Sequence, residues 1–76
     1  MIREHDSVVL ANDVPEHALQ QGDIGTVVLI HKGGAGYEVE FMTLDGETIA
    51  VLSLHASQVR PITPKEIAHT RSLQPA

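Results

Sequence analysis

The sequence predicts an all-β fold in a single small domain. Its aliphatic residues come in short blocks that turn-forming residues separate at short intervals, a pattern typical of a small barrel or sandwich. A chain of 76 residues has room for one hydrophobic core. It contains no cysteine, so neither disulfides nor cysteine-bound zinc can stabilise that core. We therefore expect five short strands held together by packing and strand pairing.

The first strand is expected at Ser7–Leu10, which is rich in β-branched residues and ends before the turn-forming residues Asn12 and Asp13. A long irregular loop follows, because Pro15 is unsuited to a central strand. Asp13 stands three residues before Glu16, the spacing of a capping box, which predicts a single helical turn. The loop residues expected to reach the core are Val14 and Leu19.

The second strand is expected over residues 26–31, after a turn at Gly22 and Asp23. Gly25 is expected to occupy a conformation, or a close approach, that a side chain would obstruct. The four consecutive aliphatic residues 27–30 indicate burial on both faces, or one face in the barrel and the other under a loop or the C-terminal tail.

The third strand, residues 37–41, follows a glycine-rich hairpin connection at residues 32–36. Its residues alternate strictly between apolar and acidic. Tyr37, Val39 and Phe41 are therefore expected to face the core, and Glu38 and Glu40 to face water. A slip of one residue would bury two carboxylates, so the register is expected to be firmly set.

The fourth and longest strand is expected over residues 48–54, after a turn at Asp45 and Gly46. A 3₁₀ turn over residues 55–58 and a short last strand over residues 59–62 complete the domain. One face of the fourth strand is expected to carry Ala50, Leu52 and Leu54, and the other Ile49 and Val51.

This chain order, one strand, a long loop, three meandering strands, a helical turn and a final strand, is that of a five-stranded SH3-like barrel. We assign it to residues 1–62. A five-stranded oligonucleotide-binding barrel is the alternative, although it usually needs more residues. Residues 63–76 form a C-terminal tail. Thr63, Pro64 and Glu66 resemble a helix start, so the tail is expected to be either a short helix over residues 64–71 or disordered, since so short a helix needs a surface to pack against.

The composition bounds the kinds of partner. Ten acidic and five basic side chains give a formal charge of −5, the wrong sign for a protein that neutralises phosphates, so nucleic acid is disfavoured. No apolar segment approaches the roughly 18 residues of a membrane span, and the charged N-terminal residues do not resemble a signal peptide. The expected location is the cytoplasm.

Motifs for catalysis or cofactor binding are not evident. The five histidines show no pair at i, i+2 or i, i+4 spacing, so no metal site is expected. The serines lack the turn and partner spacing of an activated nucleophile. The glycines of residues 33–36 lead into a strand and lack the lysine of a phosphate loop. Tyr37 and Phe41, the only aromatic residues, lie on the predicted core face, so an aromatic peptide groove is not expected. We expect a non-enzyme without cofactors.

Several motifs of the chain occur together in one known family. They are Val8, Val9, Leu10, Asp13, Val14, Pro15, Glu16, Leu19, residues 22–28, residues 37–41, Gly46, Thr48, Val59, Arg60 and Pro61. As a set they resemble a small bacterial family, domain of unknown function 4926, over roughly residues 6–62. The resemblance implies a stand-alone SH3-like bacterial protein without an assigned activity. A looser similarity links residues 22–30 with KOW-type barrels of ribosomal and transcription-elongation proteins, whose RNA-facing loops are usually basic, whereas Asp13, Glu16 and Asp23 are acidic here.

The leading hypothesis is a non-enzymatic protein-interaction or accessory module that binds another protein or a second copy of itself, so a homodimer remains open. A partner encoded by a neighbouring gene, as in a toxin and antitoxin type of pair, would suit such a module. An RNA- or ribosome-associated KOW-like module is the alternative. The second alternative is a small hydrolase or metal-dependent enzyme that uses Asp13, His17 or Asp23. In the leading hypothesis, the partner protein would contact the acidic strand face, an open strand edge or the tail. The candidate residues for this contact are Glu16, His17, Glu38, Glu40, Ile67 and Leu73.

Overall fold

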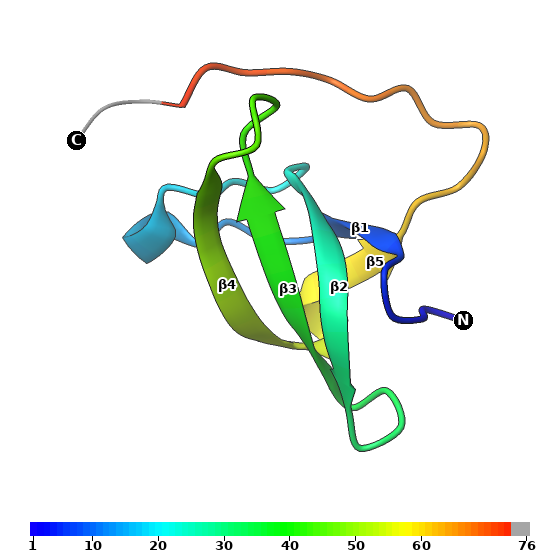
Figure 1. The fold of residues 1–76 in the computed structure, drawn as a ribbon. Coiled ribbons are helices and arrows are strands. Elements are labelled where there is room, and N and C mark those ends of the chain that lie inside the picture. The colour runs from blue at the N-terminus through cyan, green and yellow to red at the C-terminus, as the bar shows by residue number, and fades with distance from the viewer. Residues whose placement is uncertain (74–76) are drawn as a thin grey trace.

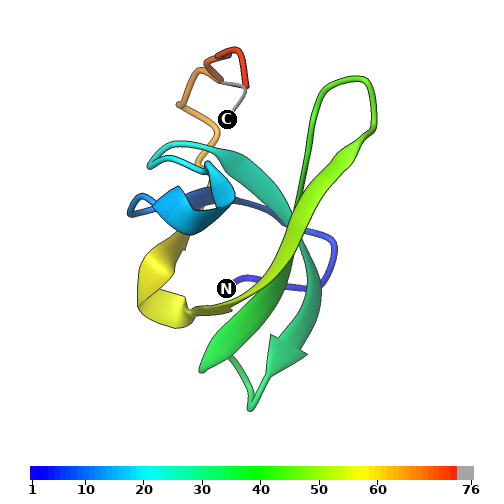
Figure 2. The ribbon, with the colours of Figure 1, turned by 90° about the vertical axis from the view of Figure 1, so that its left-hand side faces the viewer.

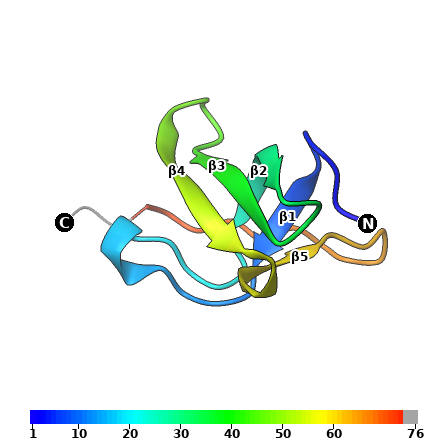
Figure 3. The same cartoon turned by 90° about the horizontal axis from the view of Figure 1, so that it is seen from below.

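The computed structural model describes residues 1–73 and is all-β, as predicted. Five antiparallel strands form one sheet in the order β4-β3-β2-β1-β5. The sheet is strongly bent, so that β1 and β5 lie across one side of the meander of β2, β3 and β4 (Figure 1, Figure 3). The strands are β1 (Ser7–Leu10), β2 (Ile24–His31), β3 (Gly36–Met42), β4 (Thr48–His55) and β5 (Val59–Pro61), and the two 3₁₀ turns are η1 (Pro15–His17) and η2 (Ala56–Gln58).

The predicted chain order of the elements is confirmed, with small changes in their bounds. β2 begins at Ile24, two residues earlier than expected, and β5 ends at Pro61. Within residues 1–73 the structure contains no helix of the length and hydrophobicity that a membrane crossing requires.

The core lies inside the bend of the sheet. The predicted inward face of β3 is confirmed, since Tyr37, Val39 and Phe41 are all buried. Val14 and Leu19 pack into the same core from the loop before β2, and their backbones pair with each other through two hydrogen bonds. The remaining buried members of the core are Val8, Leu10, Val27, Leu54 and Val59.

Gly25 is required by a close approach between β2 and β3. A Cβ atom there would lie 2.5 Å from Cγ1 of Val39 and 2.8 Å from Cε1 of Phe41. Both distances are shorter than two carbon atoms tolerate, so the predicted obstruction is confirmed. Gly22 serves differently, because its φ of +95° closes the turn that leads into β2.

The prediction that residues 27–30 are buried on both faces is wrong. Val27 is buried, but Val28 and Leu29 are exposed. The pairing of β2 with β3 shifts between Val27 and Leu29, which is the signature of a β-bulge. The bulge places Leu29 opposite the outward residue Glu38, so two of the four aliphatic side chains face away from the core.

The predicted capping box at Asp13 is also wrong. The residue before η1 is Val14, and no side chain caps the turn. The carboxylate of Asp13 instead accepts a hydrogen bond from the backbone amide of Gln21, at 2.8 Å. Asp13 therefore closes the loop across its base, because its carboxylate satisfies an amide that lies eight residues away.

The predicted helix over residues 64–71 does not form. Its first turn begins as expected: Glu66 donates its backbone amide to the carbonyl of Thr63, and the Glu66 carboxylate accepts the amide of Thr63 at 2.8 Å. Residues 67–73 then continue without regular secondary structure. We call residues 62–73 the C-terminal strap, because they run back across one end of the sheet (Figure 1). Residues 74–76 of the predicted tail lie outside the described residues.

The physical reason lies in what the strap contacts. A helix over residues 64–71 would have little apolar surface to bury, because Ile67 and Ala68 are its only aliphatic residues besides Pro64. An extended chain advances about 3.3 Å per residue, against 1.5 Å in a helix. The extended path carries Arg71 to Asp23, where it forms the ion pair described below. Tertiary contact thus prevails over a local helix signal.

Replacing Gly25 with alanine is expected to lower the free energy of unfolding by about 1–3 kcal/mol, because the added methyl group overlaps a filled core. A double-mutant cycle with Val39→Ala tests the cause, since that change removes the atom nearest to the new methyl group. Gly25→Ala should cost less in the Val39→Ala background. Urea unfolding of the four chains gives the comparison, and an equal cost in both backgrounds contradicts the overlap.

Candidate functional site

Two carboxylates lie at the centre of the face that the β2, β3 and β4 meander turns away from the core. Glu38 and Glu40 are two residues apart on β3, so their side chains point to the same side. Leu29 and Val51, beside them, have 45% and 53% of their surface exposed. We call this surface the outer face. The register makes Leu29 and Ser53 the cross-strand neighbours of Glu38, and Thr26 and Val51 those of Glu40.

The carboxylate of Glu38 is held by hydrogen bonds from two strands. The hydroxyl of Ser53 on β4 donates to it, and Nε2 of His31 on β2 lies 2.6 Å from its Oε2 atom. The bond from Ser53, and then that from His31, holds the pKa of Glu38 below its ordinary value. Because the carboxylate lies between the hydroxyl and the imidazole, His31 is not placed to take a proton from Ser53 as a catalytic base would.

The carboxylate of Glu40 is also held in place. The hydroxyl of Thr48, at the start of β4, donates to its Oε2 atom at 2.6 Å. Both central carboxylates are therefore oriented by hydroxyl groups of β4, while the aliphatic side chains on either side remain in water. The outer face combines fixed negative charge with exposed apolar surface.

A second feature is the ion pair that fastens the C-terminal strap. Arg71 donates from Nε to Oδ1 of Asp23 at 2.9 Å and from Nη2 to Oδ2 at 2.6 Å. Nη2 also donates to the carbonyl of Ala18 at 2.9 Å. The side chains of Arg71 and Asp23 are only 27% and 18% exposed, so this two-pronged contact is well shielded from water.

The pKa of Asp23 reflects that shielding. Burial acts to raise it, but the hydrogen bonds from Arg71 and from the amide of Gln20 outweigh the burial, and the pKa lies below its ordinary value. The same contact raises the pKa of Arg71. Asp23 therefore carries its charge when the strap is in place.

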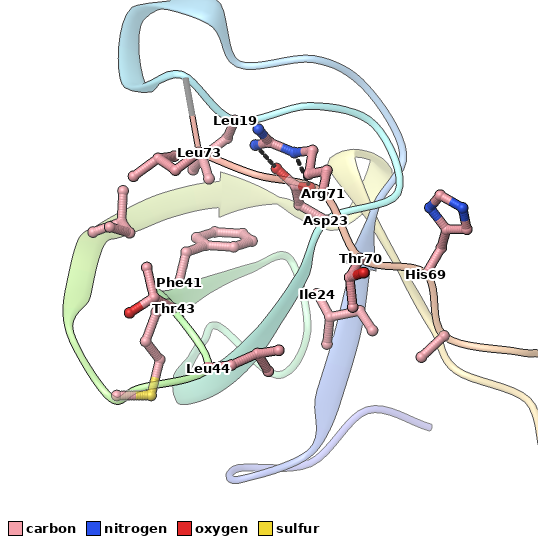
Figure 4. Close-up of a pocket in the computed structure, with 13 residues that line it drawn as sticks. Leu19, Asp23, Ile24, Phe41, Thr43, Leu44, His69, Thr70, Arg71 and Leu73 are labelled. Carbon is pink, nitrogen blue, oxygen red and sulfur yellow. Dashed lines mark hydrogen bonds and ion pairs between the residues drawn. The ribbon is translucent and has the colours of Figure 1, made fainter. Parts of the chain in front are cut away.

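Beside the ion pair lies an open cleft of about 380 Å³ between the strap and the end of the sheet (Figure 4). Its walls are mainly apolar. The loop before β2 contributes Leu19, the end of β3 contributes Phe41, and the strap contributes Leu73. Asp23 and Arg71 form its polar end, as their dashed contacts in Figure 4 show.

A second ion pair holds the beginning of the strap. Arg60 on β5 donates from Nη1 to Oε2 of Glu66 at 2.9 Å and from Nη2 to Oε1 at 2.7 Å. The hydrogen bonds from Arg60 lower the pKa of Glu66 most. Those from the amide and hydroxyl of Thr63 lower it further, so that it falls to about 2. The strap is thus attached at both of its ends, to β5 and to the loop before β2.

The structure brings together only part of the predicted partner surface. Glu38 and Glu40 share the outer face, whereas Leu73 lines the cleft under the strap. Glu16 and His17 are exposed in η1, and Ile67 is exposed on the strap. The six candidates therefore fall on separate segments.

Sequence reasoning assigned no role on these surfaces to His31, Ser53 or Arg71, and it named Asp23 as a site residue only for the enzyme alternative. Ser53 and His31 could have been found from the hairpin registers, because pairing places Ser53 directly opposite Glu38 and His31 diagonally across from it, opposite Gly36. Arg71 and Asp23 are 48 residues apart, and no local pattern connects them. Within residues 1–73, no group of three or more histidine, cysteine, aspartate or glutamate side chains is arranged to hold a metal ion.

Together these features define a small all-β domain with an acidic outer face and a strapped cleft. A family model described as domain of unknown function (DUF4926) matches residues 4–61, which is well over half of the chain. The protein belongs to this family, as the resemblance in its sequence suggested. Searches of curated proteins and of solved structures find no significant match.

The titration of Glu66 tests the attachment of the strap to β5. Because its pKa of about 2 lies below the ordinary 4.5, the contact should be complete above about pH 4.5 and lost as the pH falls through about 2. A carbon-detected NMR titration of the Glu66 carboxyl group should give a midpoint near 2, and a higher midpoint, shifted toward 4.5, in Arg60→Ala, where the hydrogen bonds from Thr63 remain. A midpoint unchanged by Arg60→Ala would contradict the contact.

Proposed function

We propose that the protein is a non-enzymatic interaction module that acts in the cytoplasm by binding another protein through its outer face. One observation carries this proposal: two carboxylates fixed by neighbouring side chains stand among exposed aliphatic residues. Membership of the family supports an uncharacterised small domain and assigns no activity.

The chemistry of the outer face indicates the partner. Burying the exposed parts of Leu29 and Val51 would contribute about 1 kcal/mol each. Glu38 and Glu40 are already oriented, so little side-chain entropy is lost when they receive a basic group. The formal charge of −5 favours the approach of a basic partner. The partner should therefore present lysine or arginine beside apolar residues.

The free edge of the sheet supports the same function. β4 pairs only with β3 within the described residues, and its eight residues include no proline and, apart from a histidine at its end, no charged residue. Such an edge can accept an added strand from a partner. Because β4 also carries Val51 and Ser53, a strand added there would reach the outer face.

The RNA-binding alternative finds less support on this face. Carboxylates at its centre repel phosphate groups, and the basic side chain beside them, His31, is engaged with Glu38. The outer face is therefore better suited to binding a protein than to binding RNA.

The experiment compares the tagged full-length chain with Glu38→Gln/Glu40→Gln in its native cells. The matched control is Glu4→Gln/Glu47→Gln, which removes the same charge from two exposed carboxylates outside the outer face. Quantitative mass spectrometry should find one protein that copurifies with the wild type and with the control, and is recovered about tenfold less with the outer-face variant, as a loss of about 1.4 kcal/mol would give.

Equal recovery of that protein with both variants would show that the outer face does not bind it. Recovery of the wild-type chain alone, as a monomer by light scattering, would overturn the proposed function. A dimer of the chain that Glu38→Gln/Glu40→Gln dissociates would make the partner a second copy.

A further inference from the structure

The C-terminal strap lies in a site shaped by other parts of the chain. The turn before β2 provides Leu19, Asp23 and the carbonyl of Ala18, and the end of β3 provides Phe41. Leu19 and Phe41 give the cleft its apolar walls, and the carboxylate of Asp23 borders it (Figure 4). The core packing of Leu19 and Phe41 fixes the walls that the sheet and the loop contribute, and the strap supplies the remaining wall.

The strap occupies this site through two side chains. Arg71 makes three hydrogen bonds at the polar end, two to Asp23 and one to the Ala18 carbonyl. Leu73, two residues later, lines the cleft beside Leu19. In an extended chain, residues i and i+2 point to the same side. Arg71 and Leu73 therefore have the spacing at which an extended segment places two side chains against one surface.

The fit of the strap is incomplete. A space of about 380 Å³ remains next to it, and 44% of the Leu73 surface is still exposed. Leu44, at the rim of the same cleft, is almost fully exposed. A segment with a larger apolar side chain at the position of Leu73 would bury more surface than the chain's own strap does.

We propose that this cleft is a binding site for an extended segment of a partner protein that carries an arginine followed two residues later by an aliphatic side chain, and that Arg71 and Leu73 occupy it when the partner is absent. Asp23 selects the arginine because a carboxylate and a guanidinium pair through two parallel hydrogen bonds. The strap then acts as a competitor attached to the same chain. This site is separate from the outer face and does not depend on the function proposed for it.

Attachment lets the strap compete when the dissociation constant of its own segment for the cleft lies below its effective concentration. A short tether holds a segment at an effective concentration in the millimolar range. A partner segment must therefore displace it, and its apparent affinity falls by the fraction of molecules whose cleft is free. Arg71→Ala should free the cleft while leaving Leu19, Asp23 and Phe41 in place.

The experiment uses fluorescence anisotropy with a labelled peptide of residues 67–73 and four full-length chains: wild type, Arg71→Ala, Asp23→Asn and Arg71→Ala/Asp23→Asn. Asparagine at position 23 keeps a side-chain oxygen that can accept the hydrogen bond from the backbone amide of Gln20. The turn before β2 should therefore still form. Thermal melting checks that each chain is folded.

Arg71→Ala should bind the peptide at least tenfold more tightly than wild type, because the competing side chain is gone. Adding Asp23→Asn should weaken that binding at least tenfold. Peptides with Arg71→Ala or Leu73→Ser should bind the Arg71→Ala chain at least tenfold more weakly than the original peptide.

Three results would overturn the proposal. The first is a folded Arg71→Ala chain that does not bind the peptide, or binds it no better than wild type. The second is binding that survives Asp23→Asn. The third is a wild-type dimer in light scattering that Arg71→Ala converts to a monomer, since the occupant would then be the strap of a second copy.

Discussion

The alternation of side chains along β3 is the constraint on which the other features depend. Tyr37, Val39 and Phe41 fill the core from one side of the strand, and Glu38 and Glu40 occupy the other. β3 pairs with both β2 and β4, so its register decides which residues of those strands join the core. A slip of one residue would exchange the two faces and bury two carboxylates, which costs several kcal/mol for each unpaired charge.

The cleft follows from the same arrangement. Phe41 closes the core near the end of β3 and also forms a wall of the cleft. Gly25 lets β2 approach β3 closely enough for this packing, and the turn at Gly22 then presents Asp23 at the end of the sheet, where Figure 2 shows the strap passing beside the loop that precedes β2. Arg71 reaches Asp23 because residues 67–73 remain extended. A small domain thus uses one packed end of its sheet both for stability and as a surface that another segment can contact.

The strands could be predicted from the sequence because their signals are local. The apolar blocks and the turn residues between them located all five strands, and the alternation of β3 identified its buried face. The role of Gly25 could be predicted because a glycine weakens a strand unless the backbone there needs the space that a side chain would fill.

The exposure of Val28 and Leu29 could not be predicted, since it depends on a bulge that appears only when β2 pairs with β3. The strap could not be predicted either: its capping residues favour a helix locally, and the ion pair that opposes the helix connects Arg71 with a residue 48 positions away. The outer face was predicted through Glu38 and Glu40, but not the groups that orient them, because His31 and Ser53 become neighbours only through strand pairing.

The register of β3 can be measured directly by nuclear Overhauser spectroscopy on the full-length chain in solution. We expect cross-strand contacts that connect Val39 with Val27 on one side and with Leu52 on the other, and Glu38 with Ser53. Contacts that instead connect Val39 with Ser53, or Glu38 with Leu52, would show a shifted register. In that case Glu38 and Glu40 would turn together toward the core, and neither the described core nor the proposed partner surface could form.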